Sequence, residues 1–402
     1  MLWAIFLHFY QPPNQKIEIL RDVVSQSYRP ILKILKKNPS GRITVNLEGC
    51  LADQLLQFGF EDVISDLKEL TERKQVEIVA SVKYHAFLPF IPEFEIARRI
   101  NEGLSTHKKI FGEDFKPCGF FPTELAVNSR IVKIVKRFGI SYLLADEISL
   151  SGKLEGIKMR HLYEDQGVKI FFANREISRE LKANPQLTFR KLSGIVLAQS
   201  QSYLVSANDA EAFGHHYPGR EEILAKIIEA QGKRWEMVTL GELLGKIKVT
   251  TGIKLQKGSW ETSREDLQKG LPFPLWYDPQ NLIQKLYWRL AWLVIDCFNR
   301  VPSREKSDPG FAWHSARDHL DRGLASCYLF WASCRPWWNP DMIILGATEL
   351  VKVTRSLNEV RVEEKRKAED LYVKIIKTAW DWHWSGEAQR RIDEFEKGER
   401  SF

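Results

Sequence analysis

A short stretch in the middle of the sequence, residues 203–219, carries the densest group of residues suited to chemistry. Its apolar start, YLV, is typical of a buried strand. Two carboxylates and two imidazoles follow, and these are Asp209, Glu211, His215 and His216. Carboxyl and imidazole groups supply most of the acid–base and nucleophilic chemistry of enzymes. We therefore expect a functional site where this strand ends.

Polar residues of the same kinds follow four other apolar runs, in the stretches HFYQPP, NLEGCLADQL, VKYHAFLP and GFFPTELAVN. Their polar members are His8, Gln11, Glu48, Asp53, His85 and Glu124. Each has a structural explanation by itself: His85 can be a core histidine, and Glu124 can cap a helix that begins near Asn128. Because five strand ends are involved, the carboxyl end of a parallel sheet is the expected place of the site.

The elements that must position these residues alternate between strand and helix over the first two thirds of the chain. Short apolar runs predict strands over 2–7, 42–47, 76–80, 118–121, 142–145, 169–173, 202–207 and 236–239. Amphipathic patterns predict helices over 17–37, 60–73, 95–110, 129–138 and 221–230. This β-α-β alternation indicates an α/β fold with a parallel sheet, and the number of repeats favours a closed barrel.

The pattern changes after about residue 250. A segment rich in Gly, Pro and polar residues, 251–278, is expected to connect two domains. Helices are expected beyond it, over 279–299, 312–332, 341–357 and 360–384. The predicted organisation is a catalytic domain over 1–250, this connection, and a helical C-terminal domain over 279–402.

Composition limits the partners. The chain has 59 Lys plus Arg against 52 Asp plus Glu, a net charge of +7 without a basic block, so we expect no nucleic-acid partner. The 13 Trp, 22 Phe and 11 Tyr serve a core and also suit ring-shaped ligands such as sugars.

The cysteines and the N-terminus bear on the cellular compartment. Five cysteines without a C-x-x-C pair indicate reduced thiols. The N-terminus lacks the features of a signal peptide, and no apolar run approaches the ~20 residues of a membrane span. A cytoplasmic protein without a membrane partner is expected, and its oligomeric state is left open.

Five stretches, HFYQPP, EGCLADQLL, VKYHAFLP, GFFPTELAVN and ANDAEAFGHH, in this order resemble the motifs of glycoside hydrolase family 57, α-amylase-like enzymes that act on α-glucans. The resemblance covers about residues 1–245, and GSWET, FPLW and SCYLFWASCRPWW are less specifically similar to the C-terminal portion of that family. It implies an incomplete (β/α)7 barrel followed by an all-helical domain, with both contributing to the cleft. It also implies retaining hydrolysis or transfer on α-1,4-glucans or maltooligosaccharides through a covalent glycosyl-enzyme, with no cofactor and no metal.

The same resemblance assigns residues. Glu124 of PTE corresponds to the nucleophile and Asp209 of DAEAFG to the general acid/base; retaining cleavage requires two such carboxyls about 5 to 5.5 Å apart. Two positions depart from the family motifs, since Tyr10 replaces a histidine and Ala210 replaces a glycine. The residues expected to bind substrate are His8, Gln11, His85, Phe121, Glu211, His215, His216, Trp260, Trp337 and Trp338.

Two alternatives belong to other classes of protein. A metal-dependent polysaccharide deacetylase would use His8, His85, His215 and Asp209 as ligands, although no two histidines have the spacing of a helical ligand pair. A catalytically weak carbohydrate-binding protein on the same scaffold is the other, and Tyr10 and Ala210 are its support. Among enzymes, hydrolysis, 4-α-glucan transfer and branching share one intermediate, and the sequence does not separate them.

Overall fold

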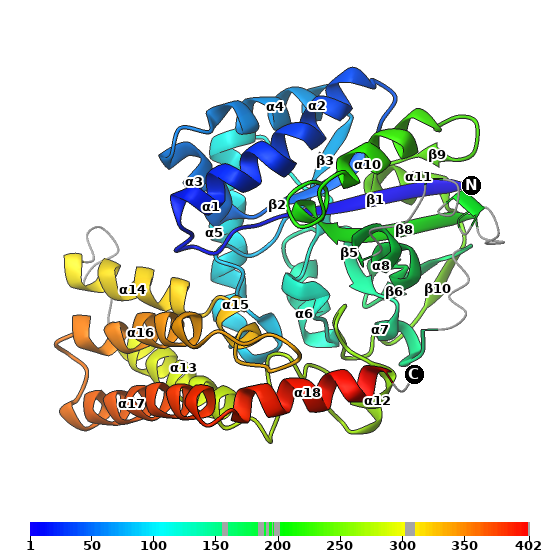
Figure 1. Cartoon of the computed structure of the whole chain (residues 1–402). Coiled ribbons are helices and arrows are strands. Elements are labelled where there is room, and N and C mark those ends of the chain that lie inside the picture. Colours follow the sequence, from blue (N-terminus) through cyan, green and yellow to red (C-terminus); the bar gives the residue numbers. More distant parts are fainter. Residues whose placement is uncertain are drawn as a thin grey trace. The chain divides into compact units, whose positions relative to one another are not determined.

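The computed structural model describes residues 1–154, 160–183, 189, 193, 194, 196, 202–301 and 310–400. The chain divides into two compact units (Figure 1). The first unit comprises Met1–Lys83 and Leu88–Trp260. The second comprises Tyr84–Phe87 and Glu261–Phe402.

The first unit contains two sheets, and the first sheet is entirely parallel. Its strands are β1 (Leu2–Phe9), β2 (Ile43–Leu47), β3 (Val76–Ile78), β8 (Tyr203–Asp209) and β9 (Glu236–Met237). Their order is β3-β2-β1-β8, and β9 also pairs with β1. In this register His8 lies between Asn46 of β2 and Asp209 of β8.

The second sheet has the order β10-β6-β7-β5-β4. Its strands are β4 (Gly119–Phe120), β5 (Tyr142–Asp146), β6 (Leu162–Asp165), β7 (Val168–Ala173) and β10 (Thr250–Gly252). All its pairs are parallel except β6 with β7, which form an antiparallel hairpin through Gln166 and Gly167. The eight expected strands are confirmed, whereas β6 and β10 were not expected because LYED and TTG contain no apolar run.

Backbone hydrogen bonds join the two sheets at two places. Beyond the ends of β3 and β4, Ala80 N donates to Gly119 O at 2.9 Å and Phe121 N donates to Ala80 O at 2.8 Å. Beyond the end of β7, Asn174 N donates to Val205 O of β8 at 2.8 Å.

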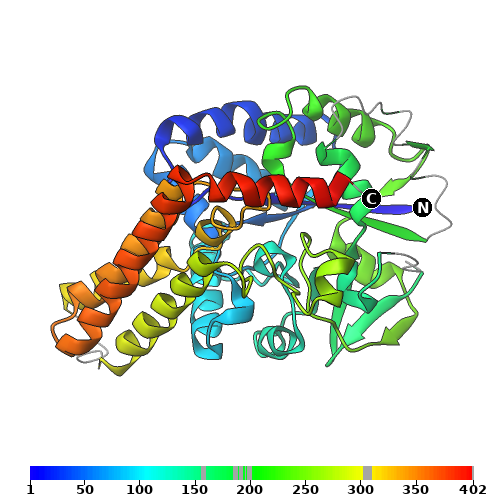
Figure 2. The ribbon, with the colours of Figure 1, turned by 60° about the horizontal axis from the view of Figure 1, so that its bottom comes forward.

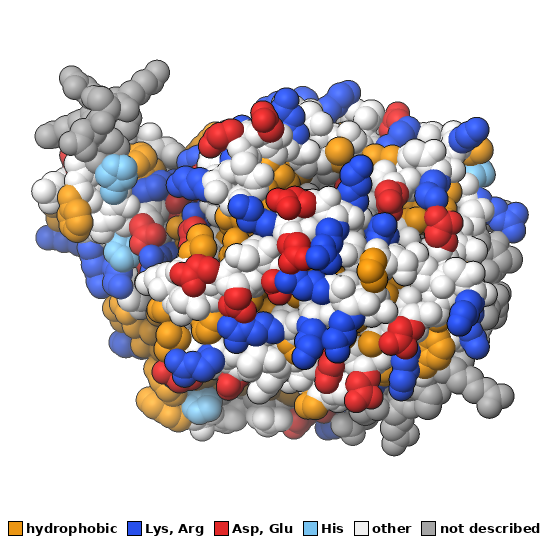
Figure 3. All heavy atoms as spheres, turned by 90° about the horizontal axis from the view of Figure 1, so that it is seen from above, with side chains coloured by type: hydrophobic (Ala, Val, Ile, Leu, Met, Phe, Trp, Pro, Cys, Tyr) orange, Lys and Arg blue, Asp and Glu red, His pale blue; other side chains and the backbone are white. Residues whose placement is uncertain are grey.

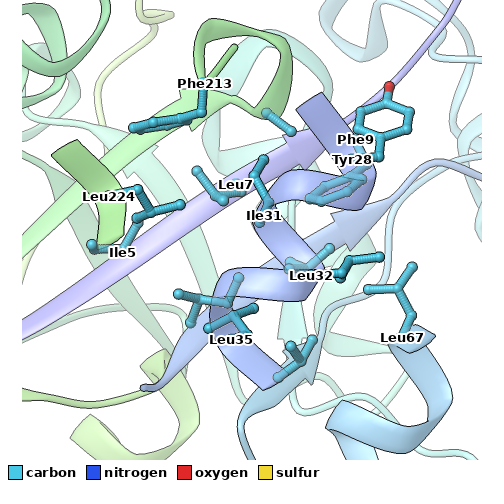
Figure 4. Close-up of a cluster of buried hydrophobic side chains, with 14 of the residues drawn as sticks. Ile5, Leu7, Phe9, Tyr28, Ile31, Leu32, Leu35, Leu67, Phe213 and Leu224 are labelled. Atoms are coloured by element: carbon cyan, nitrogen blue, oxygen red, sulfur yellow. The ribbon is translucent and has the colours of Figure 1, made fainter. Parts of the chain in front are cut away.

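Helices cover the outer face of the first sheet. The expected helix over 17–37 is one continuous run made of α1 (Ile17–Val23), a π-helical turn η1 (Val24–Tyr28) and α2 (Arg29–Lys37). Figure 4 shows the odd-numbered residues of β1, among them Leu7 and Phe9, packed with Ile31 and Leu32 of α2. Because strand residues alternate, the even-numbered Phe6 and His8 point to the opposite face, where both contact Phe121.

The other helices of the first unit follow the strands along the chain. They are α3 (Gly49–Gln57), α4 (Glu61–Glu72), α5 (Glu93–Phe111), α6 (Ser129–Lys136), α7 (Ile148–Ser151), α8 (Arg175–Ala183), α10 (Arg220–Glu229) and α11 (Leu240–Lys246).

The second unit is helical. Its helices are α12 (Arg264–Gln268), α13 (Leu282–Arg300), α14 (Phe311–Gly323), α15 (Cys327–Phe330), α16 (Pro340–Ser356), α17 (Val362–Trp384) and α18 (Glu387–Arg400). Helices α13, α14 and α17 pack against α16, as Figures 1 and 2 show. No helix in the described part of the chain has the length and apolar character to cross a bilayer.

The expected single helix over 312–332 is wrong, because α14 ends at Gly323 and α15 begins at Cys327. Between them Ala325 pairs with Ala86, and Ser326 N donates to His85 O at 2.9 Å. The backbone groups used in this pairing are those that a continuous helix would need for its own hydrogen bonds.

The surface carries charges of both signs. On the face shown in Figure 3, basic and acidic side chains are interspersed, consistent with the small net charge of +7. All five cysteines are free, and four of them are buried.

Candidate active site

His8 lies at the centre of the candidate site in the first unit. Its Nδ1 donates to Asn46 Oδ1 at 2.8 Å, and its ring stacks on Tyr10 with ring centroids 5.5 Å apart. Burial lowers the pKa of His8 to about 4, although the charge of Asp209 and the bond to Asn46 oppose the shift. The imidazole is therefore neutral at neutral pH, with Nε2 as an acceptor.

The two carboxyl groups that follow β8 have different surroundings. Asp209 is half-buried at the strand end, while Glu211 is only 3% exposed. Glu211 Oε1 accepts from Gln11 Nε2 at 2.9 Å and from the Tyr28 hydroxyl. Burial and the charge of Asp209 raise the pKa of Glu211 to about 8. Glu211 is therefore protonated at neutral pH.

The π-helical turn η1 holds the loop that contains these residues. Ser27 Oγ donates to Ala210 O at 2.7 Å, and His215 Nδ1 donates to Gln26 Oε1 at 2.7 Å. Gly214 has a φ of +114°, and a Cβ there would lie 1.9 Å from Gln26 O. Extra residues in a π-turn commonly serve functional sites, and here the turn directs three consecutive residues at one loop.

Glu124 follows β4 and is 9% exposed. Its backbone is left-handed, with φ +63°. Trp260 Nε1 donates to Glu124 Oε2 at 3.0 Å, and Trp260 N donates to Glu124 O at 3.4 Å. Helix α6 is capped instead by Asn128, whose Oδ1 accepts from Ile131 N at 3.0 Å. A left-handed non-glycine residue is uncommon, and such conformations cluster at functional sites.

Ring contacts link His8 and Asp209 to the part of the site that contains Glu124. The His8 ring lies 4.6 Å from Phe121 and 6.5 Å from Trp260, measured between centroids. Phe121 is fully buried, so in this structure it supports His8 from behind and does not line a surface. His8 thus contacts the tryptophan that binds Glu124, and it pairs in register with Asp209.

Other sequence candidates have structural partners elsewhere. Glu48 caps α3 by accepting from Cys50 N at 2.6 Å, and Asp53 forms an ion pair with Lys83 at 2.6 Å. The side chain of His216 is exposed.

Three expected substrate-binding residues belong to the second unit. His85 Nδ1 shares a hydrogen bond with Ser326 Oγ at 2.9 Å. Trp337 is 43% exposed and stacks on Phe330 with centroids 5.1 Å apart, and Trp338 stacks on Trp382 at 6.0 Å. Trp276 is fully buried against Phe87 and belongs to the core.

Metal-ligand geometry is not found in the described ranges, where no three His, Cys, Asp or Glu side chains come together so as to hold a metal ion. The ligand set of a deacetylase, which would need His8, His85, His215 and Asp209, is thus not assembled among these residues.

Two residues of the site were missed from the sequence. Asn46 is a polar amide inside the buried strand ITVNL, a signal that points to a buried partner. The sequence does not predict a role for Tyr28 in the site, because it fits the apolar face of an amphipathic helix.

Comparison with known proteins identifies the family. The model of "Glycosyl hydrolase family 57" matches residues 5–256. An "Alpha-amylase" of Pyrococcus abyssi is 30% identical over 141 residues, which are 35% of this chain and 21% of that protein. A "Putative alpha-amylase" of Methanocaldococcus jannaschii is 27% identical over 281 residues, 63% of this chain and 58% of that protein. The chain therefore spans from about a fifth to three fifths of the length of these relatives.

Solved structures show the same fold. A GH57-type branching enzyme from Pyrococcus horikoshii has a TM-score of 0.73 at 17% identity, covering 92% of this chain and 94% of that one. A 4-alpha-glucanotransferase from Thermococcus litoralis has a TM-score of 0.66 at 18% identity, covering 89% and 59%. The expected fold class is thus confirmed as an α/β fold with a parallel sheet followed by a helical region.

Proposed function

Since this chain belongs to glycosyl hydrolase family 57, we propose that it cleaves or transfers α-1,4-linked glucans with retention of configuration. The observation that carries the proposal is the setting of Glu124. It is a buried carboxylate at a strand end, held in a left-handed conformation, with one oxygen fixed by an indole N–H. A fixed orientation of the carboxylate favours its attack on a carbon atom.

We further propose that the two sheets of the first unit form one incomplete (β/α)7 barrel. The proposed ring has the order β1, β2, β3, β4, β5, β7 and β8, and it is supported by the strand pairs within each sheet, including β8 with β1. The hydrogen bonds at Ala80 and at Asn174 supply the two links between sheets. Such a ring would bring the carboxyl ends of β4 and β8, and hence Glu124 and Asp209, to one end of the barrel.

The proposed reaction has two steps. Glu124 attacks the anomeric carbon while Asp209 gives its proton to the glycosidic oxygen, so that one C–O bond forms as the other breaks. In the second step the Asp209 carboxylate takes a proton from water or from a sugar hydroxyl, whose oxygen displaces Glu124. Neutral His8, in register with Asp209, can accept a hydrogen bond from a sugar hydroxyl through Nε2.

The two departures from the family motifs are compatible with this reaction. Ala210 is fully buried and does not adopt a positive φ, so its position does not require glycine. Tyr10 stacks on His8, and its carbonyl oxygen accepts from the Tyr28 hydroxyl at 3.3 Å. These contacts argue against a decayed site that only binds carbohydrate.

The variant Glu124→Gln tests the proposal. Turnover of maltoheptaose and amylose should fall by several orders of magnitude, roughly 10⁴-fold or more, since the covalent route is lost, while sugar binding persists. A fluorinated α-glycosyl fluoride should label Glu124 in the native protein, as located by mass spectrometry of peptides. Product analysis of the native reaction then separates hydrolysis, transfer and branching.

The matched control is Glu77→Gln. Glu77 is a half-buried carboxylate of the same unit that accepts from Tyr142 and Gly241, and it has no role in the proposed reaction. It should keep native turnover. More than about a tenth of native activity in Glu124→Gln, or a label on another residue, would contradict the assignment.

A further inference from the structure

Arg175 and Asp146 form a buried ion pair next to the candidate site. Asp146 ends β5 and is 2% exposed, and Arg175 follows β7 and is 5% exposed. Arg175 Nε donates to Asp146 Oδ2 at 3.1 Å, and Nη2 donates to the other carboxylate oxygen. Burying two charges costs free energy that their attraction often does not recover, so such a pair requires a reason beyond stability.

The guanidinium has a second acceptor. Arg175 Nη2 donates to the carbonyl oxygen of Ser259 at 3.0 Å. Ser259 is fully buried and directly precedes Trp260, the residue whose indole donates to Glu124. The ion pair is therefore one peptide unit away from the donor to the proposed nucleophile.

Trp260 ends a segment, residues 255–260, that belongs to no helix or strand and depends on contacts with other elements. Leu255 N donates to Asp165 Oδ2 at 3.1 Å, and Gln256 N donates to Ser149 O at 2.9 Å. Gly258 O accepts from Val127 N at 3.0 Å. Arg175 supplies the next attachment along this segment, directly before Trp260.

We infer that Arg175, oriented by Asp146, is a positioning residue that places the Trp260 indole on Glu124 through the carbonyl of Ser259. The inference rests on the proposed function, because it assigns Arg175 an effect on the reactivity of Glu124. A planar guanidinium serves the carboxylate and the carbonyl at the same time with donors in fixed directions. A lysine ammonium keeps the charge for Asp146 but lacks this fork.

The first test is Arg175→Lys, assayed on an aryl α-maltoside. We expect kcat to fall roughly 10- to 100-fold, the factor that corresponds to one hydrogen bond to a charged group, with KM changed less than about threefold. The rate at which a fluorinated glycosyl fluoride labels Glu124 should fall by the same factor. Arg317→Lys is the matched control, since Arg317 forms another buried pair, with Asp321, on a helix of the second unit.

A double-mutant cycle separates positioning from general destabilisation. Trp260→Phe removes the indole donor, and adding Arg175→Lys to it should then cost less than about twofold more, because both changes remove one interaction. If the losses multiply instead, Arg175 does not act through Trp260 and the inference is overturned.

A second variant covers the case in which Arg175→Lys does not fold. Asp146→Asn combined with Arg175→Gln removes both charges together, so no unpaired charge stays buried. It should show the same loss in kcat and in labelling rate. If Glu124 is labelled at the same rate in the native protein and in the folded variants, the inference is overturned and the proposed function stands. If the native protein is not labelled, the proposed function is overturned as well.

Discussion

Asp209 and Glu211 differ in what their carboxyl groups can reach. Glu211 is bound by Gln11 and Tyr28 in the interior, and its pKa is raised to about 8, so it is neutral at pH 7. Asp209 is half-buried at the end of β8, where a ligand can approach it. Glu211 is thus protonated but enclosed, whereas Asp209 lies where a ligand can approach. Because a proton donor must first touch its acceptor, we assign the general acid/base to Asp209.

Leaving-group dependence distinguishes the two residues. Asp209→Asn should lose roughly 10²- to 10⁴-fold on maltooligosaccharides and much less on aryl glycosides, whose leaving groups depart without a proton. Glu211→Gln keeps the size and the acceptor oxygen, and it should lose the same modest factor on both substrates. Steady-state rates on the two substrate classes decide the assignment, and the reverse pattern would make Glu211 the acid.

The two proposed catalytic residues could be predicted from sequence because each lies in a short local motif, PTE or DAEAFG. Their partners could not. Asn46, Arg175 and Tyr28 act on His8, Ser259 and Glu211, which lie 38, 84 and 183 positions away along the chain. Such contacts depend on which elements pack together in the fold, and the sequence pattern of a single element does not predict them.

At the scale of elements, the strands were predictable for a related reason. Strands buried on both faces are mostly apolar runs, so β1 and β5 are visible by composition alone. Strands β6 and β10 are instead stabilised by their pairing with neighbouring strands. Strand β6 forms a hairpin with β7, and the exposed β10 pairs with β6. The π-turn η1 was also hidden, since its buried residues Val24, Ser27 and Tyr28 continue the i, i+3, i+4 spacing of the helices on either side.

The packing of η1 against the loop after β8 predicts different costs for two glycines. Gly214→Ala places a Cβ 1.9 Å from Gln26 O at a φ of +114°, so the loop must move. Gly219→Ala has a φ of +86° but meets nothing within 4 Å. Gly219→Ala should cost about 1 kcal/mol of backbone strain, and Gly214→Ala more than about 2 kcal/mol.

Urea unfolding of both variants measures these costs, and kcat measures the effect on the site. Because Gly214 lies in the loop that carries Asp209 and Glu211, its variant should lose at least about tenfold in kcat while Gly219→Ala stays near native. Equal stability and equal activity in the two variants would show that η1 does not hold this loop.

At the scale of the whole molecule, the question is whether the helical unit contributes to substrate binding. Its tryptophans range from buried to exposed. Trp276 and Trp288 are at most 1% exposed and belong to the core, whereas Trp337 is 43% exposed, stacked by one face on Phe330. Trp337 also has an edge contact with Trp331 at 5.8 Å between ring centroids, and the exposed part of such an indole is suited to contact a sugar ring.

We therefore predict that Trp337→Ala weakens the binding of long glucans and leaves the fold nearly intact. The loss should be roughly 1 to 3 kcal/mol, by analogy with base stacking on aromatic side chains. It should appear with maltoheptaose and shrink with shorter oligosaccharides that do not reach this ring.

Trp276→Ala is the control for a core ring, and it should lower the free energy of unfolding by about 3 to 5 kcal/mol. Calorimetric titration and thermal melting of both variants provide the measurement. Unchanged maltoheptaose affinity in Trp337→Ala, with a melting temperature lowered as far as in Trp276→Ala, would make this segment structural and leave substrate binding to the first unit.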